Sequence, residues 1–293
     1  MGKLVKKMFF DELWQKGIYD KKAKEREDVY FETLRDSFGF KFCRTLKDLK
    51  FRDLVGFFNP RSGEKVLDVG CFSGHILNRL SVDFKIKGYG VDISPLAIKL
   101  AKEYRGKSRF FVASGYNLPF NKNYFDGIIS LDVLEHISNK KEFIKELFRV
   151  LKPNGWFVIY SVSRRSKYTF NWLRWLFKKN PRNEYGEWKE AGHKAKLLTN
   201  IGDIEKLFNG KIIYFHSFFT LIFDLYIARI FNKFFHLYLK KFGKKRLFLL
   251  EKIFLFVYSF IFRFALFLSE LLDFPWKTLA LSNGFFIVGR KKA

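Results

Sequence analysis

The stretch that decides the fold is Val66–Leu77, which reads VLDVGCFSGHIL. Apolar residues surround Asp68 as in a buried strand, and Gly70 and Gly74 then predict a tight turn that leads into a helix. Because glycine has no Cβ, the backbone of such a turn can pass close to a ligand. The same turn also occurs where a helix merely packs on a strand, so further residues must decide between these interpretations.

Short apolar runs alternate with helical stretches after this turn. Such alternation predicts parallel strands joined by crossover helices, and therefore a doubly wound, mostly parallel α/β fold. Ser94 with Pro95, and also Asn139, are typical helix starts and predict helices after the second and fourth strands. The predicted strands cover residues 66–69, 89–93, 110–113, 125–131, 155–161, 211–215 and 283–290.

Asp92 stands at the end of the second predicted strand, 18 residues after Gly74. In a parallel sheet the carboxyl ends of the strands meet at one edge, and this edge binds ligands. A carboxylate there can accept hydrogen bonds from two ribose hydroxyls. The turn and Asp92 together predict a ligand that contains a nucleoside, whereas plain turn and helix-cap roles are the alternative.

Four motifs carry a family resemblance: VLDVGCFSG, VDIS, NLPFNKNYFDGIISLDVLEHI and FRVLKPNGWFVIY. In order and spacing they resemble the class I S-adenosylmethionine-dependent methyltransferases of type 11, especially the branch that includes quinone-biosynthesis methyltransferases. The resemblance covers roughly residues 60–161. It implies a seven-stranded Rossmann-like sheet whose last strand, FFIVGR, is antiparallel. We expect a helical N-terminal cap (1–60), a cofactor-binding domain (61–216 and 282–293) and a helical insertion (217–281).

The resemblance also implies where S-adenosylmethionine binds: its methionine end over the glycine turn, its ribose at Asp92 and its adenine near Leu118. Two departures from the family pattern matter. Phe72 replaces a frequent glycine, so its ring must point away from the ligand, and Ser114 replaces an aspartate, which predicts a weaker contact to adenine. The implied cofactor-binding residues are Asp68, Gly70, Cys71, Gly74, Asp92, Ile93, Ser114, Leu118 and Leu131.

Methyl transfer from a sulfonium needs chiefly a nucleophile held in line and the exclusion of water. A hydroxyl acceptor also benefits from a general base, and His136 and His193 are the candidates. His193 resembles a histidine that relatives place before strand six, with a surface loop residue as the alternative. Asp132, Glu135 and His136 form D-x-x-E-H, a set that can bind a divalent metal. Glu135 equally suits a helix N-terminus, and we predict no metal.

The chain is strongly basic, with 55 Lys and Arg against 29 Asp and Glu in 293 residues and a net charge of +26. Residues 161–293 carry 25 basic and 9 acidic side chains. Such a surface attracts the phosphates of nucleic acid or of an anionic bilayer. Cys43 and Cys71 show neither a zinc spacing nor a disulfide framework, which favours a reducing cytoplasm.

Two long aromatic helices are predicted within residues 217–281, each with a wide apolar face. In the second, Lys252, Ser259, Arg263 and Glu270 form a narrow polar stripe. The run Ile253–Phe262 is about half the length of a transmembrane span. Packing on the sheet is one interpretation; attachment to a membrane surface, with aromatic and basic residues at the headgroups, is the one we favour.

Two enzymatic functions follow from these features. The first is a methyltransferase on the cytoplasmic face of the membrane, which methylates a lipid-soluble or lipid-linked acceptor. The second is an RNA methyltransferase, in which the basic stretch at residues 164–182 contacts phosphates and Trp172 or Trp175 stacks on bases. A third, non-enzymatic interpretation keeps the fold as a scaffold for protein association.

Overall fold

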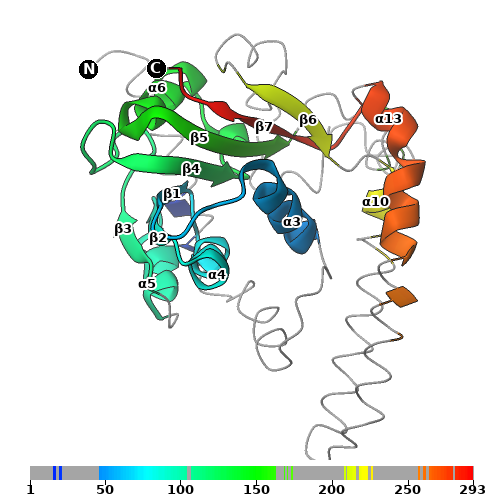
Figure 1. The fold of residues 1–293 in the computed structure, drawn as a ribbon, viewed down its shortest axis with the longest axis horizontal. Coiled ribbons are helices and arrows are strands. Elements are labelled where there is room, and N and C mark those ends of the chain that lie inside the picture. Colours follow the sequence, from blue (N-terminus) through cyan, green and yellow to red (C-terminus); the bar gives the residue numbers. More distant parts are fainter. Residues whose placement is uncertain are drawn as a thin grey trace, which may run out of the picture.

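The computed structural model describes residues 46–103, 107–162, 210–215, 218–223, 264–279 and 281–292, and also residues 16, 17, 20, 21, 168, 170, 173, 208, 226, 257, 260 and 261. Within these residues seven strands form one sheet in the order β3-β2-β1-β4-β5-β7-β6 (Figure 1). The strands are β1 (Lys65–Val69), β2 (Lys87–Asp92), β3 (Arg109–Val112), β4 (Phe125–Leu131), β5 (Leu151–Val162), β6 (Lys211–Phe215) and β7 (Gly284–Arg290).

Strands β1 to β5 are parallel, and β7 pairs antiparallel with both β5 and β6. The predicted doubly wound α/β sheet with an antiparallel last strand is therefore confirmed. Strand β5 begins at Leu151, directly after helix α6, and so starts earlier than the sequence predicted. Leu151 pairs there with Phe125, and the register shifts between Phe125 and Gly127. The early start of β5 therefore includes a pairing with the first residue of the neighbouring strand β4.

Between residues 46 and 150 the described helical segments are α3 (Leu46–Phe58), α4 (His75–Phe84), α5 (Pro95–Glu103), the 3-10 helix η1 (Leu134–His136) and α6 (Lys140–Val150). The predicted helix starts are confirmed by their caps. The Oγ of Ser94 accepts the backbone N–H of Ala97 at 3.0 Å, and the side chain of Asn139 accepts that of Glu142 at 3.3 Å. Each cap satisfies an N–H group that a helix start leaves without an intrahelical partner.

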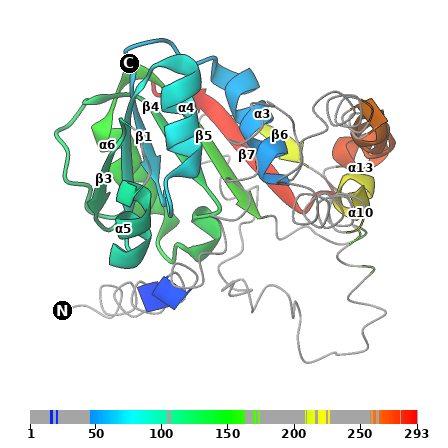
Figure 2. The same cartoon turned by 90° about the horizontal axis from the view of Figure 1, so that it is seen from below.

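Helices lie on both faces of the sheet (Figure 2). A cluster of buried apolar side chains packs on each face. On one face Phe51 of α3 and Leu77 of α4 pack with Phe286 of β7. On the other face Phe143 and Leu147 of α6 pack against the strands. Burial on both faces explains why the strands read as continuous apolar runs, and it leaves the carboxyl ends of the strands as the place for polar groups.

Short helices α10 (Phe219–Ile222) and α13 (Phe274–Thr278) lie in the predicted insertion. The predicted boundaries at residues 60, 216 and 281 stay predictions, because most of the cap and of the insertion lies outside the described residues. No helix in the described parts of the chain has the length and apolar character needed to cross a bilayer.

Candidate functional site

The glycine turn after β1 has the left-handed backbone that its sequence predicts. Gly70 has φ 81° and Gly74 has φ 72°. The N–H of Gly70 donates to the carbonyl of Val91 at 2.8 Å, which ties the turn to the end of β2. A Cβ at Gly70 would lie 2.2 Å from Cγ2 of Val133, and one at Gly74 would lie 2.5 Å from the ring of Phe110. Both glycines are therefore required by backbone conformation and by space.

Asp92 joins the turn to the start of α5. Its two carboxylate oxygens accept the N–H groups of Phe72 and Ser94, each at 2.9 Å. Phe72 itself has φ 46°, and its ring packs against Ala97 and Leu100 of α5. The ring thus has apolar partners on this helix, whereas its direction relative to a bound ligand stays a prediction.

Three titratable side chains of the predicted cofactor set lie close together at the ends of β1 and β2. Burial, and then the charge of Asp92, raise the pKa of Asp68 to about 8. Burial raises the pKa of Asp92 to about 6, although the N–H groups of Ser94 and Phe72 oppose this shift. Burial and both carboxylates raise the pKa of the Cys71 thiol. A cationic group bound beside these carboxyls would offset the cost of their burial and favour their ionised form.

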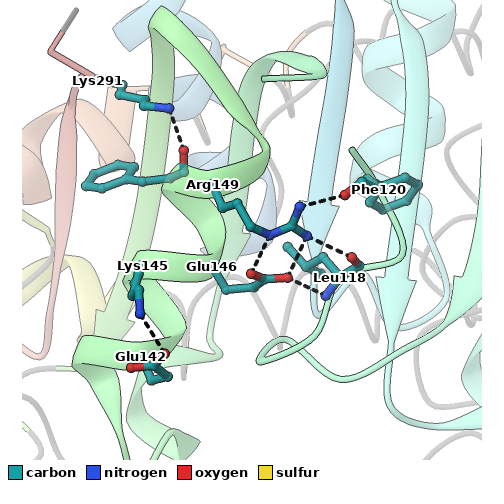
Figure 3. A network of polar contacts seen from close by, with 8 residues as sticks. Leu118, Phe120, Glu142, Lys145, Glu146, Arg149 and Lys291 are labelled. Carbon is teal, nitrogen blue, oxygen red and sulfur yellow. Dashed lines mark hydrogen bonds and ion pairs between the residues drawn. The ribbon is translucent and has the colours of Figure 1, made fainter. Parts of the chain in front are cut away.

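Ser114 and Leu118 lie in the loop that follows β3. The hydroxyl of Ser114 accepts the N–H of Tyr116 at 3.1 Å. Leu118 is buried, and its N–H donates to Glu146 at 2.7 Å while its carbonyl accepts Arg149 at 3.0 Å (Figure 3). Helix α6 therefore holds this loop through a carboxylate and a guanidinium, and the backbone of Leu118 already has partners.

Ile93 and Leu131 complete the predicted cofactor set, and both are half-buried. Ile93 lies between Asp92 and the cap of α5, whereas Leu131 ends β4 and packs on the core beside α3. The structure thus places the nine predicted residues at the carboxyl ends of β1 to β4, with the turn and Asp92 in direct hydrogen-bond contact.

Two polar side chains at the turn and on α4 have no hydrogen-bond partner among the described residues. They are the hydroxyl of Ser73, which is 1% exposed, and the amide of Asn78, which is 7% exposed. An unsatisfied buried polar group typically costs about 1–3 kcal/mol. Polar groups of a bound ligand would supply the missing partners.

Two residues of the predicted N-terminal cap reach this edge of the sheet. The Oγ of Ser94 donates to Asp20 at 2.5 Å, next to Asp92. The ammonium of Lys50 donates to both oxygens of Asp132, at 2.7 and 2.6 Å, and lies 3.8 Å from the ring centre of Tyr160. Asp132 follows β4 in a left-handed conformation, with φ 58°. The cap is thereby joined to the ends of β2 and β4.

Two residues of the D-x-x-E-H motif, Asp132 and Glu135, have different partners. Asp132 pairs with α3, and Glu135 accepts the hydroxyl of Ser161 at 3.1 Å. Glu135 is fully buried; this burial, and then the charge of Asp132, raise its pKa to about 8. His136 is buried in η1, and His193 lies outside the described residues. In the region that the structure describes, no group of three or more His, Cys, Asp or Glu is arranged for a metal ion.

Sequence reasoning missed Lys50 and His75. Lys50 is separated from Asp132 by 82 positions, and no local pattern marks the pair. His75 follows the glycine turn directly; burial, and then the charge of Arg79, lower its pKa to about 4. Its imidazole is therefore neutral at neutral pH. In the sequence, its position directly after the glycine turn and at the start of a helix was the feature that could have marked it.

Residues 67–159 match a family model described as a methyltransferase domain. This part of the chain is a class I S-adenosylmethionine-dependent methyltransferase domain. A sterol 24-C-methyltransferase of Pneumocystis carinii is 31% identical over 186 residues, which are 58% of this chain and 47% of that protein. A mitochondrial ubiquinone biosynthesis O-methyltransferase of Schizosaccharomyces pombe is 34% identical over 115 residues, 36% of this chain and 40% of the relative.

Other relatives include a tRNA (carboxymethyluridine(34)-5-O)-methyltransferase of Arabidopsis thaliana. The chain spans less than half the length of these relatives. Among solved structures, phosphoethanolamine N-methyltransferase 2 of Haemonchus contortus, bound to phosphomonomethylethanolamine and S-adenosylhomocysteine, has a TM-score of 0.53. It is 18% identical, and the match covers 83% of this chain and 52% of that one, so it shows the fold.

Proposed function

We propose that this protein is an S-adenosylmethionine-dependent methyltransferase that works on the cytoplasmic face of a membrane. The methyl acceptor would be a lipid-soluble or lipid-linked small molecule. The observation that carries the enzymatic part is the direct hydrogen bond from the glycine turn to Asp92 within a methyltransferase domain. The acceptor and the membrane attachment rest on charge, on the exposed apolar residues and on the chemistry of the relatives.

The residues at the turn fit S-adenosylmethionine. Each oxygen of Asp92 accepts one backbone N–H and keeps a further lone pair for a ribose hydroxyl. Asp68 and Asp92 favour a cation nearby, and Ser73 offers a buried hydroxyl without a partner among the described residues. When bound, the cofactor supplies an activated methyl group on a sulfonium. The turn and Asp92 would hold it in place, and the packing of Val133 on Gly70 excludes water from the turn.

The groups beyond β4 would serve the acceptor. Lys50 holds the half-exposed carboxylate of Asp132 beside the turn, and the buried carboxyl of Glu135 lies behind it. His136 and His193 stay our candidates for the general base. Because His136 is 7% exposed, it can serve as a base toward an acceptor that enters the protein interior. An apolar acceptor enters such a site at low desolvation cost.

The charge of +26 would suit either a lipid membrane or RNA. The exposed apolar side chains of helical residues 264–272 and of α13 favour a lipid acceptor. The names of two relatives, for a sterol and a ubiquinone methyltransferase, agree with a lipid-soluble acceptor. RNA methylation stays the alternative because a tRNA methyltransferase is also a relative.

Incubation with methyl-labelled S-adenosylmethionine tests both functions. The protein is mixed in parallel with a total lipid extract and with total RNA, and label is measured in each fraction. We expect label in the lipid fraction and none above background in RNA. Label in RNA alone would replace the lipid proposal with the alternative. If neither fraction is methylated and calorimetry shows no cofactor binding, the non-enzymatic interpretation, a scaffold for protein association, would replace both enzymatic proposals.

A further inference from the structure

Residues 264–272 are helical and lead into α13 (Phe274–Thr278), and we call this part of the chain the C-terminal helix. Large apolar side chains on this helix and close to it in the sequence lie on the outside of the protein. We call these side chains the outer face. Their exposed fractions lie between 43% and 68%, values that are high for residues of this size. The outer face consists of Val257, Phe260, Ile261, Phe264, Phe267, Leu268, Leu271, Leu272, Phe274 and Leu279.

The buried side of the same helix is in part polar. Leu266, Ser269 and Asp273 are 4%, 6% and 0% exposed, and at 3.6 residues per turn they share one side. Leu266 packs in the core beside α3, and the hydroxyl of Ser269 donates to the carbonyl of Leu266 at 2.7 Å. Phe264 and Phe267 belong to the opposite side by the same periodicity. This helix therefore has the reverse of the polarity expected for a surface helix in water.

Contacts at its end hold the helix in this orientation. The buried carboxylate of Asp273 accepts the N–H groups of Phe218, Phe219 and Thr220, at 2.9, 2.7 and 3.2 Å. Trp276 stacks on Phe218 with ring centres 5.2 Å apart. Figure 1 shows α10 beside this helix at the end of the sheet where β6 lies. The exposure of the outer face is thus imposed by specific polar and aromatic contacts.

Two contacts join the end of this helix to residues that are far away in the sequence. The indole N–H of Trp276 donates to the carbonyl of Tyr168 at 2.9 Å, and the ring of Phe170 lies 5.6 Å from that of Phe218. The sequence of residues 161–293, which includes the outer face, carries 25 basic and 9 acidic side chains. An anionic partner therefore suits this part of the sequence.

We propose that the outer face inserts into an anionic phospholipid bilayer, whose phosphates attract the net positive charge of the chain. Exposed phenylalanines and leucines in a strongly basic protein match the two attractions that hold a monotopic protein at the interface. A second copy of this chain would bring the same excess of positive charge to the contact, which opposes association. This inference rests on the membrane attachment proposed above and identifies the surface responsible.

Vesicle flotation with the full-length chain tests the proposal. The triple variant Phe264→Ser/Phe267→Ser/Leu271→Ser is compared with the control Val82→Ser/Val112→Ser, which changes exposed apolar residues on α4 and β3. Vesicles contain equal parts of phosphatidylcholine and phosphatidylglycerol, or phosphatidylcholine alone. We expect the wild type and the control to float with the anionic vesicles, and the triple variant to lose about tenfold or more in affinity. Vesicles of phosphatidylcholine alone should bind all three proteins more weakly.

Circular dichroism first verifies that all variants are folded. Each result of the flotation experiment then supports a different conclusion. If wild type and triple variant float equally, the outer face is not the inserting surface, although membrane attachment stands. If the wild type floats with neither vesicle, both the inference and the membrane attachment fail. Labelling from S-adenosylmethionine, measured on the same samples, tests methyl transfer independently. A dimer of the wild type that the triple variant abolishes without lipid would assign the face to a second copy and overturn the proposal.

Discussion

Gly70→Ala is the substitution whose cost the structure defines best. Gly70 has φ 81°, and an alanine Cβ built there lies 2.2 Å from Cγ2 of Val133. A left-handed backbone costs an L-residue about 1–2 kcal/mol. Overpacking against a neighbour adds about 1–3 kcal/mol. The free energy of unfolding of Gly70→Ala should therefore lie about 2–5 kcal/mol below that of the wild type.

A second substitution separates the two contributions. Val133→Ala removes Cγ2, and the remaining Cβ of residue 133 lies 3.5 Å from the new methyl group, an ordinary contact distance. In the Val133→Ala background, Gly70→Ala should therefore cost only the backbone share, about 1–2 kcal/mol. Urea unfolding of the wild type, both single variants and the double variant measures this coupling. Strictly additive changes would refute the claim that Val133 closes the space at Gly70.

Three further predictions follow from buried carboxyl groups. Folding raises the pKa of Glu135 from 4.5 to about 8. As pH rises between these two values, the free energy of unfolding of the wild type should therefore fall relative to that of Glu135→Gln. In urea unfolding the loss should be at most about 1.4 kcal/mol per pH unit. Cofactor affinity, measured by calorimetry, should fall as pH drops below about 6, because protonation of Asp92 removes an acceptor and its charge. Asp273→Ala leaves three N–H groups of residues 218–220 without their acceptor, and it should lower the free energy of unfolding by about 3 kcal/mol or more. Asp273→Asn keeps one acceptor oxygen and should therefore lose less stability than Asp273→Ala.

The candidate cofactor-binding residues at the carboxyl ends of β1 to β4 could be predicted from the sequence because they lie in short motifs. The alternation of strands and helices brings the end of β2 beside the end of β1, and this places Asp92 at the turn. Lys50 could not be predicted, because its contact with Asp132 depends on how α3 packs against the sheet. The contact of Val133 with Gly70 likewise joins two loops that are distant in the sequence.

The C-terminal helix shows a different limit. Periodicity predicts which residues share a side, including the polar stripe that contains Glu270, but it does not say which side packs on the protein. In the structure the buried side contains Ser269 and Asp273, since Asp273 is needed to cap α10. The apolar residues are then left on the outside. One long-range polar contact therefore decided the orientation of the helix.

Calorimetric titration with S-adenosylmethionine tests the central claim, that the glycine turn and Asp92 hold an adenosyl group. The wild type is compared with Asp92→Ala and with the control Asp126→Ala. The control removes a partly buried carboxylate that pairs with Lys152 and accepts the N–H of Lys65, near the opposite ends of the strands. We predict saturable binding by the wild type and the control, and no measurable binding by Asp92→Ala. Binding of equal affinity by Asp92→Ala, once its fold is verified, would contradict the account.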